Sequence, residues 1–293
     1  MTLACANCQS PRLLSYMPYK YHGVEFFDLF PKLEILGCAD CSLVQVDHTQ
    51  LDAAKLQAFY ENEYRRDDTP ASAYAGQLKT ERFEARAESL LQGALPLIGA
   101  KSVTTIFELG AGYGYNIRRF GQHFKNAVLY ADDPDSNHNL FAEVKRAKLT
   151  GLKPDIVILS HVLEHVIMPR ARISEIVSRL TPGGVIVVEV PNEKHALLAA
   201  KGSHQPHITF FTRETLRKVF ENHANLSIDR VVSAGFLNSD NDKPYITTTI
   251  HVGGWKPVTV SVDRRTLDRA GFDFTNERDD EEGGWLRLYA RKT

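Results

Sequence analysis

Three glycines at alternating positions, in the run Glu108-Leu109-Gly110-Ala111-Gly112-Tyr113-Gly114, are the residues of this chain best suited to bind a ligand. The apolar residues before them predict a buried strand, and the residues after them predict a helix. Glycine lets the backbone come close to a ligand and lets the helix begin tightly against the strand. A second predicted strand ends in Asp132 and Asp133, about twenty residues later, where a doubly wound sheet places a carboxylate against ribose hydroxyls. These positions predict a site for a ribose-containing cofactor.

Four cysteines indicate a second kind of chemistry. They form two pairs, Cys5-x-x-Cys8 and Cys38-x-x-Cys41. Each pair can place two thiolates on one tight turn, so the doubled pattern favours a tetrahedral zinc site. Its role should be structural, because four thiolates leave no position for water or substrate. Two disulfides or four unrelated thiols are the alternatives, and the absence of a secretion signal argues against disulfides.

The spacing of the glycines distinguishes between families of cofactor-binding folds. Dinucleotide folds carry G-x-G-x-x-G, whereas this chain has E-x-G-x-G-x-G with the acid at the strand end. The pattern resembles motif I of class I S-adenosylmethionine-dependent methyltransferases, and residues 155–165 and 180–192 resemble that family's fourth and fifth strands. The resemblance implies S-adenosylmethionine as cofactor, with the acid of motif I near its methionine amino group and an acid-then-proline step at its ribose. The cofactor-binding residues expected on this basis are Glu108, Gly110, Gly112, Gly114, Asp132, Asp133 and His161, with Asp133 preferred to Asp132 for the ribose.

The N-terminal part of the chain narrows the resemblance. The residues around the second cysteine pair, and the segment Phe59-Tyr60-Glu61-Asn62-Glu63-Tyr64-Arg65, are similar to the zinc-binding methyltransferases of bacterial deoxysugar biosynthesis. Those enzymes carry a zinc-bound N-terminal domain, and several methylate nucleotide-linked keto-sugars at carbon. The resemblance implies a sugar, a nucleotide-sugar or a surface-glycan precursor as the acceptor. Tyr64, Arg65 and Asn192 are candidates to bind it, although a turn-forming role is the alternative for Asn192.

Histidines are the candidates for the catalytic base. In the sugar C-methyltransferases a glutamate–histidine pair precedes the late helix, whereas this chain has Pro206-His207. C-methylation needs a base and a group that stabilises the enolate, so loss of the glutamate favours O- or N-methylation with a histidine general base. His207 is the first candidate, against a purely structural role in its loop. His161, at the carboxyl edge of the sheet, and His165 follow, although Glu164-His165 also fits a structural pair.

The order of the predicted elements indicates an α/β protein with a doubly wound, Rossmann-like methyltransferase sheet, preceded by a small zinc-binding module and a helical segment. We expect a zinc-binding module at 1–48, a helical linker or lid at 49–95 and the S-adenosylmethionine-binding domain at 96–293. The expected strands lie near 103–109, 127–132, 155–160, 184–190, 226–233 and 284–291. The expected helices lie near 51–64, 74–91, 114–124, 135–146, 162–180 and 213–223.

Two segments are harder to place. Twenty residues lie between Pro134 and Asp155, fewer than in the family. Either the third strand is compressed into Arg146–Leu152 or the sheet lacks a full edge there, and this strand normally carries an adenine contact. The insertion at 235–283 is expected to hold an extra hairpin or a cover over the site.

Composition sets the remaining expectations. The 293 residues have a net charge of −1 and a pI near 6.8, so the chain has no electrostatic footprint for nucleic acid or an anionic membrane. No apolar run has the length of a membrane span. We expect a cytoplasmic enzyme with a small-molecule acceptor; the oligomeric state is not indicated. The rival functions are a nicotinamide-dependent oxidoreductase and a non-catalytic, cofactor-binding partner protein.

Overall fold

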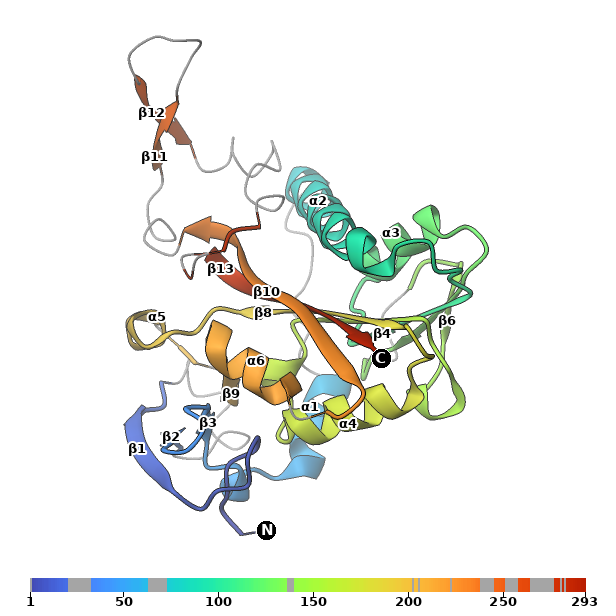
Figure 1. Cartoon of the computed structure of the whole chain (residues 1–293). Coiled ribbons are helices and arrows are strands. Elements are labelled where there is room, and N and C mark those ends of the chain that lie inside the picture. Colours follow the sequence, from blue (N-terminus) through green and yellow to red (C-terminus); the bar gives the residue numbers. More distant parts are fainter. Residues whose placement is uncertain are drawn as a thin grey trace.

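A seven-stranded sheet forms the centre of the molecule, in the order β10-β13-β8-β7-β4-β5-β6 (Figure 1). Strands β8, β7, β4, β5 and β6 are parallel, and β13 pairs antiparallel with both β8 and β10. The computed structural model describes residues 2–20, 33–62, 73–135, 140–201, 203–204, 206–221, 223–237, 245–250, 258–263, 277–279, 281 and 283–293. The strands of the sheet are β4 Thr105–Leu109, β5 Val128–Asp132, β6 Val144–Arg146, β7 Ile156–Ser160, β8 Val185–Pro191, β10 Leu226–Leu237 and β13 Gly283–Lys292.

Helices cover both faces of this sheet. On one face lie α2 Ala73–Ile98 and α3 Tyr115–His123, and on the other lie α4 Pro169–Arg179 and α6 Arg213–Glu221 (Figure 1). Each face has its own apolar core, and the central strand β7 is buried on both sides, as a strand of a parallel sheet is. The chain order reverses between β4 and β7, so the carboxyl ends of these strands form the switch point where doubly wound sheets bind ligands.

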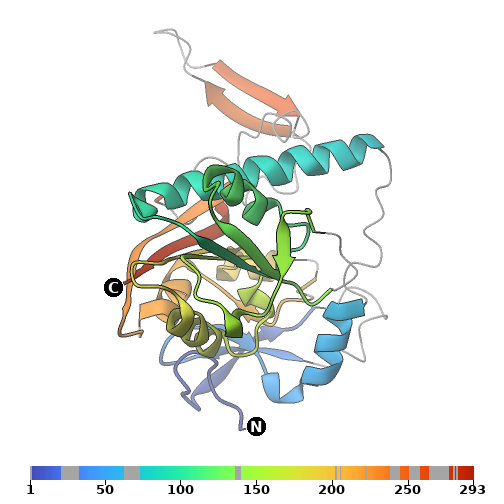
Figure 2. The ribbon, with the colours of Figure 1, turned by 90° about the vertical axis from the view of Figure 1, so that its right-hand side faces the viewer.

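A second, smaller sheet lies on the α4 and α6 side of the central sheet (Figures 1 and 2). Its order is β1-β2-β3-β9, and its fourth strand comes from much later in the chain than the other three. A separate apolar cluster joins this sheet to α1 Ala53–Asn62, which follows the short helix η1 His48–Gln50. The strands are β1 Leu13–Pro18, β2 Glu34–Cys38, β3 Val44–Val46 and β9 Thr209–Phe210.

The remaining described elements are short or peripheral. They are η2 Leu149–Gly151, η3 Leu163–His165, α5 His195–Ala200 and the hairpin of β11 Tyr245–Ile250 with β12 Val258–Asp263. This hairpin confirms the extra pair of strands expected in the 235–283 insertion. Within the described part of the chain, no helix is both long and apolar enough to cross a membrane.

The six strands expected from the sequence are all present in the central sheet, with small shifts of their ends. The helix predicted at 135–146 is wrong for the residues described there. That segment ends instead in β6, whose Val144 is buried and pairs in parallel with Leu129. The spacing of its apolar residues favoured a helix, but tertiary pairing overrides such local preference. The compressed third strand therefore exists, slightly before the predicted Arg146–Leu152.

The predicted helix at 162–180 is also interrupted. The chain forms η3 at Leu163–His165, then three non-helical residues, and α4 begins at Pro169. Proline is favoured at the first position of a helix and disfavours helical backbone in the residue before it. This break matters for function, because it presents the residues of η3 at the edge of the sheet.

Candidate functional site

The glycine loop joins β4 to α3 at the switch point of the sheet. Gly110, Gly112 and Gly114 have φ angles of 65°, 54° and 79°, which residues with a side chain rarely adopt. A Cβ atom on Gly110 would lie 2.6 Å from Cγ2 of Val162. The three predicted glycines thus form the left-handed turn from which α3 begins.

Glu108, the acid that precedes the glycines, is buried beneath the loop. Its Oε1 accepts a hydrogen bond from Nδ2 of Asn116 at 2.9 Å, and its Oε2 accepts one from the backbone N–H of Ile117 at 3.0 Å. Burial raises the pKa of Glu108 to about 7, although these hydrogen bonds oppose the shift. The carboxyl group therefore fixes the first turn of α3, and its contact with the cofactor amino group stays a prediction.

The two acids after β5 point in different directions. Oδ1 of Asp132 accepts a hydrogen bond from Lys148 at 2.7 Å, on the surface. Oδ2 of Asp133 accepts one from the backbone N–H of Gly112 at 2.7 Å, and Asp133 is buried against the loop. The side chain of Asp133, and not that of Asp132, thus occupies the position beside the glycines that was predicted for a ribose ligand.

A pocket of about 200 Å³ opens at this edge of the sheet. The residues that line it include Gly110 and Asp133, and also Tyr60, His161 and His165, with Val166 and Arg172. Tyr60 belongs to α1, so the segment before the central sheet contributes directly to the pocket. The pocket therefore joins residues predicted for the cofactor to two of the three predicted catalytic histidines.

His161 and His165 flank the fully buried Glu164 on the turn after β7. His161 has a φ of 55°, uncommon for a residue with a side chain, and its Nδ1 lies 3.2 Å from Oε1 of Glu164. Nδ1 of His165 lies 3.0 Å from the hydroxyl oxygen of Tyr60. Burial lowers the pKa of His165 to about 4, so its imidazole is neutral near pH 7.

His207 lies behind His165 and is not among the described residues that line the pocket. The centroids of the two rings are 5.1 Å apart. Nδ1 of His207 lies 2.8 Å from Oε1 of Glu193, which Lys201 also contacts. A glutamate–histidine pair therefore exists in space although Pro206 replaces the glutamate in sequence. Sequence reasoning missed Glu193, whose only signal was its place just beyond the fifth strand.

Glu189, near the end of β8, is a fully buried carboxylate that two arginines balance. Nε of Arg287 donates to its Oε2 at 2.8 Å, and Arg86 pairs with its Oε1. Burial would raise the pKa of Glu189, but the charges of the two arginines lower it to about 2. Arg86 also donates to Oγ of Ser160 at 2.9 Å, so this network ties α2 and β13 to the sheet beside the pocket.

Of the residues predicted to bind the acceptor, Asn192 is the one that the structure describes, and it does not line the pocket. Tyr64 and Arg65 lie outside the described residues. Asn192 is buried, and its Nδ2 donates to the carbonyl oxygens of Glu281 and Gly283 at 2.8 and 2.9 Å. Its side chain therefore holds the start of β13, and a role toward the acceptor stays a prediction.

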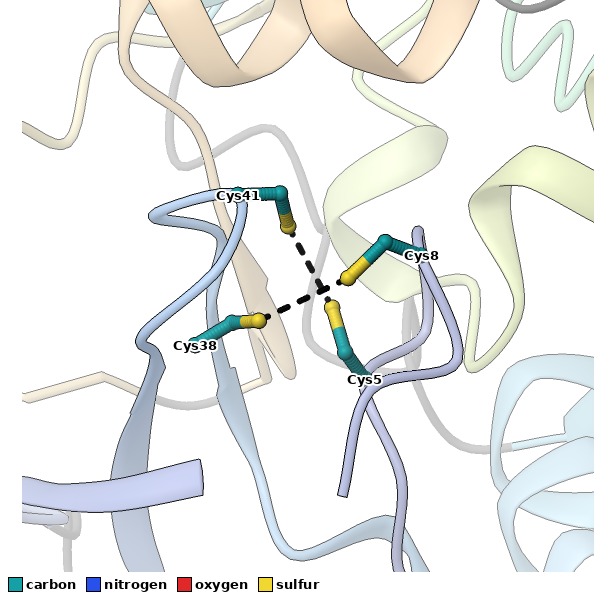
Figure 3. A group of neighbouring side chains, drawn as sticks. All are labelled: Cys5, Cys8, Cys38 and Cys41. Carbon is teal, nitrogen blue, oxygen red and sulfur yellow. Dashed lines mark hydrogen bonds between the residues drawn. The ribbon is translucent and has the colours of Figure 1, made fainter. Parts of the chain in front are cut away.

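The four cysteine side chains point toward one another (Figure 3). The Sγ atoms of Cys5 and Cys41 are 3.4 Å apart and those of Cys8 and Cys38 are 3.6 Å apart. None of the four forms a disulfide. A tetrahedral site with Zn–S bonds of about 2.3 Å has sulfur–sulfur edges of about 3.8 Å. The predicted ligand set therefore fits zinc in both donor type and spacing.

The two cysteine turns have the same backbone form. The residue after each pair, Gln9 or Ser42, has a positive φ of 60° or 66°. Its backbone N–H donates to the carbonyl oxygen of Cys5 or Cys38 at 3.0 or 2.9 Å. Two similar turns thus present two sulfur atoms each to one point.

Comparison with known proteins establishes the family. The model of the methyltransferase domain family matches residues 79–231, more than half of the chain. The chain belongs to this family and is an S-adenosylmethionine-dependent methyltransferase. Membership decides against the nicotinamide-dependent alternative. No curated protein matches the chain.

Solved structures of methyltransferases are similar at low identity. The plantazolicin methyltransferase BpumL in complex with SAH is 12% identical, with a TM-score of 0.46 over 81% of this chain and 94% of that chain. The N-methyltransferase NodS from Bradyrhizobium japonicum WM9 is 16% identical, with a TM-score of 0.42 over 82% and 97%. A SAM-dependent methyltransferase from Thermotoga maritima is 14% identical, with a TM-score of 0.46 over 81% and 100%. Likeness at this level carries no argument about the acceptor.

Proposed function

We propose that this methyltransferase transfers the methyl group of S-adenosylmethionine to an oxygen or nitrogen atom of a small polar acceptor, namely a sugar, a nucleotide-sugar or a surface-glycan precursor. The observation that supports this most is the pocket, whose lining includes Gly110 and Asp133 together with Tyr60, His161 and His165. Hydroxyl and imidazole groups suit a polar acceptor. A glycine of the loop and the carboxylate of Asp133 suit the cofactor.

The cofactor is assigned to the loop side of the pocket. Its sulfonium supplies an electrophilic methyl group. The loop brings its backbone to the pocket at Gly110, Asp133 supplies a carboxylate for ribose hydroxyls, and Glu108 keeps the loop in shape by accepting from the N–H of Ile117. Neither Gly110 nor Gly114 can gain a side chain without strain, which fits a backbone that must lie against a ligand.

The acceptor is assigned to the histidine side of the pocket. Methyl transfer needs in-line placement of the acceptor atom and a route for its proton. His161 and His165 line the pocket, and His207 acts behind His165 rather than as the first contact. The predicted base is thereby narrowed from three histidines to the two that the acceptor can reach.

The cysteine cluster is assigned to one structural zinc ion. Four convergent thiols in a core cluster shared with β7 and α4 support this assignment.

Calorimetric titration of the zinc-replete protein with S-adenosylhomocysteine tests the cofactor site. We expect saturable binding to wild type, at least tenfold weaker binding to Glu108→Ala, and unchanged binding to Lys125→Ala, an exposed residue far from the loop. Screening nucleotide-sugars for methylation with labelled S-adenosylmethionine then tests the acceptor. Turnover of a catechol or a peptide, and of no sugar, would contradict the sugar assignment while leaving methyl transfer intact.

Sugar C-methylation is the second candidate, and the Glu193–His207 pair favours it. C-methylation needs a carbon-bound proton to leave before the methyl group arrives, and a carboxylate-held imidazole is suited to that step. Proton exchange distinguishes the two reactions. A keto-sugar incubated in D₂O with enzyme and S-adenosylhomocysteine exchanges its α-hydrogen only if the enzyme forms the enolate.

A further inference from the structure

We propose that Glu164, His165 and His207, here called the Glu-His cluster, form a second metal site, which binds one divalent first-row transition-metal ion beside the acceptor pocket. Each of these residues offers a ligand atom, and the three atoms lie within 4.8 Å of one another. One ligand, His165, lines the pocket, so an ion held here would be within reach of a bound acceptor. The site is separate from the cysteine cluster and shares no residue with it.

The strongest support is the state of the Glu164 side chain. It is fully buried, and neither carboxylate oxygen accepts a hydrogen bond from the described part of the protein. Its described ionic neighbours are imidazoles, with Nδ1 of His161 at 3.2 Å and Nε2 of His165 at 3.9 Å from Oε1. Glu189, on the neighbouring strand and equally buried, is balanced by Arg86 and Arg287. A buried carboxylate without such partners is costly unless a cation completes it.

The two imidazoles are held as metal ligands usually are. Ligating histidines generally have one ring nitrogen fixed by a carboxylate, a carbonyl or another polar group, which leaves the second nitrogen for the ion. Nδ1 of His207 is held by Glu193 at 2.8 Å, and Nδ1 of His165 by the hydroxyl of Tyr60 at 3.0 Å. The second nitrogen of His165, Nε2, lies on the side of Glu164, 3.9 Å from its Oε1.

The backbone also fixes the two segments that supply the ligands. The N–H of Ile208 donates to the carbonyl oxygen of Glu164 at 2.9 Å, so the residue after His207 is bonded to η3. The hydroxyl of Thr209 donates to the carbonyl oxygen of Val166 at 3.1 Å. The two segments that supply the ligands are thus joined to each other without the ion.

The donor set indicates the ion. Two imidazoles and one carboxylate suit zinc, iron, cobalt, nickel or manganese better than magnesium or calcium, which prefer oxygen. Three protein ligands leave positions open for water or for a hydroxyl of the acceptor. Resting on the proposed O-methylation, the ion would lower the pKa of that hydroxyl. The O–H bond then breaks with its proton passing to His161, the pocket histidine outside the Glu-His cluster. The O–CH₃ bond forms as the S–CH₃ bond breaks, and S-adenosylhomocysteine leaves.

Cobalt binding tests the site independently of activity. Protein that retains one zinc ion per chain is titrated with Co²⁺ and followed by visible absorption and calorimetry. We expect one Co²⁺ per chain, with the weak absorption bands of nitrogen and oxygen ligands. A thiolate charge-transfer band should be absent, because that band would indicate cobalt in the cysteine cluster. Glu164→Gln and His207→Asn should each weaken binding on the order of 100-fold, and Glu193→Gln about 10-fold. His123→Ala, an exposed histidine on α3, is the matched control and should bind as wild type does.

Two results would overturn the second site. One is a zinc-retaining wild type that takes up no cobalt, and the other is Co²⁺ binding that Glu164→Gln and His207→Asn leave unchanged. A variant that retains zinc and binds S-adenosylhomocysteine is folded. If Glu164→Gln does not fold, His207→Asn provides the test of the second site. Loss of S-adenosylhomocysteine binding by wild type would instead contradict the cofactor assignment and leave the metal result to stand alone.

Discussion

The cysteine cluster and the Glu-His cluster gather possible metal ligands in opposite ways. The first takes four sulfur atoms from two similar tight turns and fills every position of a tetrahedral site (Figure 3). The second takes a carboxylate and two imidazoles from two segments that meet only in the folded protein, and one of them lines the pocket. The first is complete in itself, whereas the second has positions left for a ligand.

If both proposals hold, this difference separates a structural centre from a reactive one. The cysteines share an apolar core with β7 and α4, where nothing else needs to enter. The Glu-His cluster lies at the carboxyl edge of the parallel strands, where doubly wound sheets bind their ligands. A closed ligand set should therefore be needed for stability, and an open one for binding and rate.

The largest expected effect is on the closed centre. Cys41→Ser removes one zinc ligand, and we expect loss of the zinc ion and destabilisation on the order of 5 kcal/mol or more, because binding of a structural zinc ion is itself folding free energy. Metal content and thermal unfolding of the purified variant check this. Full zinc occupancy in Cys41→Ser, or an unchanged unfolding midpoint without zinc, would contradict the role of the cysteine cluster as a structural zinc site.

The next largest effect is expected at Glu189, in comparison with the equally buried Glu164. Glu189→Gln should destabilise the protein by about 3–5 kcal/mol, because it leaves the buried guanidinium of Arg287 with Glu277, at 3.4 Å, as its remaining carboxylate partner. Glu164→Gln should cost less than about 1 kcal/mol when only the zinc ion is present, because no arginine or lysine in the described structure depends on it. Urea unfolding of both variants measures the difference. Equal losses would mean that the protein itself balances Glu164.

A third buried carboxylate, Glu108, extends the comparison, because its contribution to stability should depend on pH. Its pKa is about 7 in the folded protein against 4.5 without the fold, so the folded state holds an extra proton between these values. The stability that this group contributes is full below pH 4.5 and is lost as the pH rises through about 7. Glu108→Gln lacks the titration, so it should gain on wild type by up to about 1.4 kcal/mol per pH unit between pH 5 and 7. Denaturant midpoints at pH 5 and 7.5 test this, and a gap that does not grow with pH contradicts it.

The smallest effect concerns the hydroxyl that holds His165. Tyr60→Phe removes one hydrogen bond, worth about 1 kcal/mol, and should weaken cobalt binding about tenfold while leaving the zinc ion in place. Tyr16→Phe, on β1, is the control and should change neither metal. Equal cobalt affinity in the two variants would mean that the Tyr60 hydroxyl does not support metal binding by the Glu-His cluster.

Much of the fold follows from local patterns. The apolar runs of β7 and β8, and the glycines after β4, predict the centre of the sheet because each is a continuous signal within a few residues. The failures lie where distant pairing decides. β6 is three residues long and exists through its pairing with β5, and β9 is two residues long and exists through its pairing with β3. No window around either segment contains its partner.

The site divides in the same way. The two cysteine pairs and the glycine loop can be recognised from their residue spacing, because each is formed by residues that are close in sequence. Glu193 and Tyr60 do not, since the first reaches His207 and the second reaches His165 only after the chain has folded. The sequence indicated the lost glutamate before His207, but it could not indicate that another element supplies one.

The pairing of β9 with β3 joins the N-terminal sheet to the segment that carries His207. Tyr19 donates a hydrogen bond to the carbonyl oxygen of His207 at 2.9 Å, and Val46 donates one to that of Ile208 at 2.9 Å. The position of the segment that carries His207 therefore depends on both sheets. An evolutionary exchange of the N-terminal portion for that of a relative would re-aim a histidine of the site, so acceptor preference and zinc module should be inherited together.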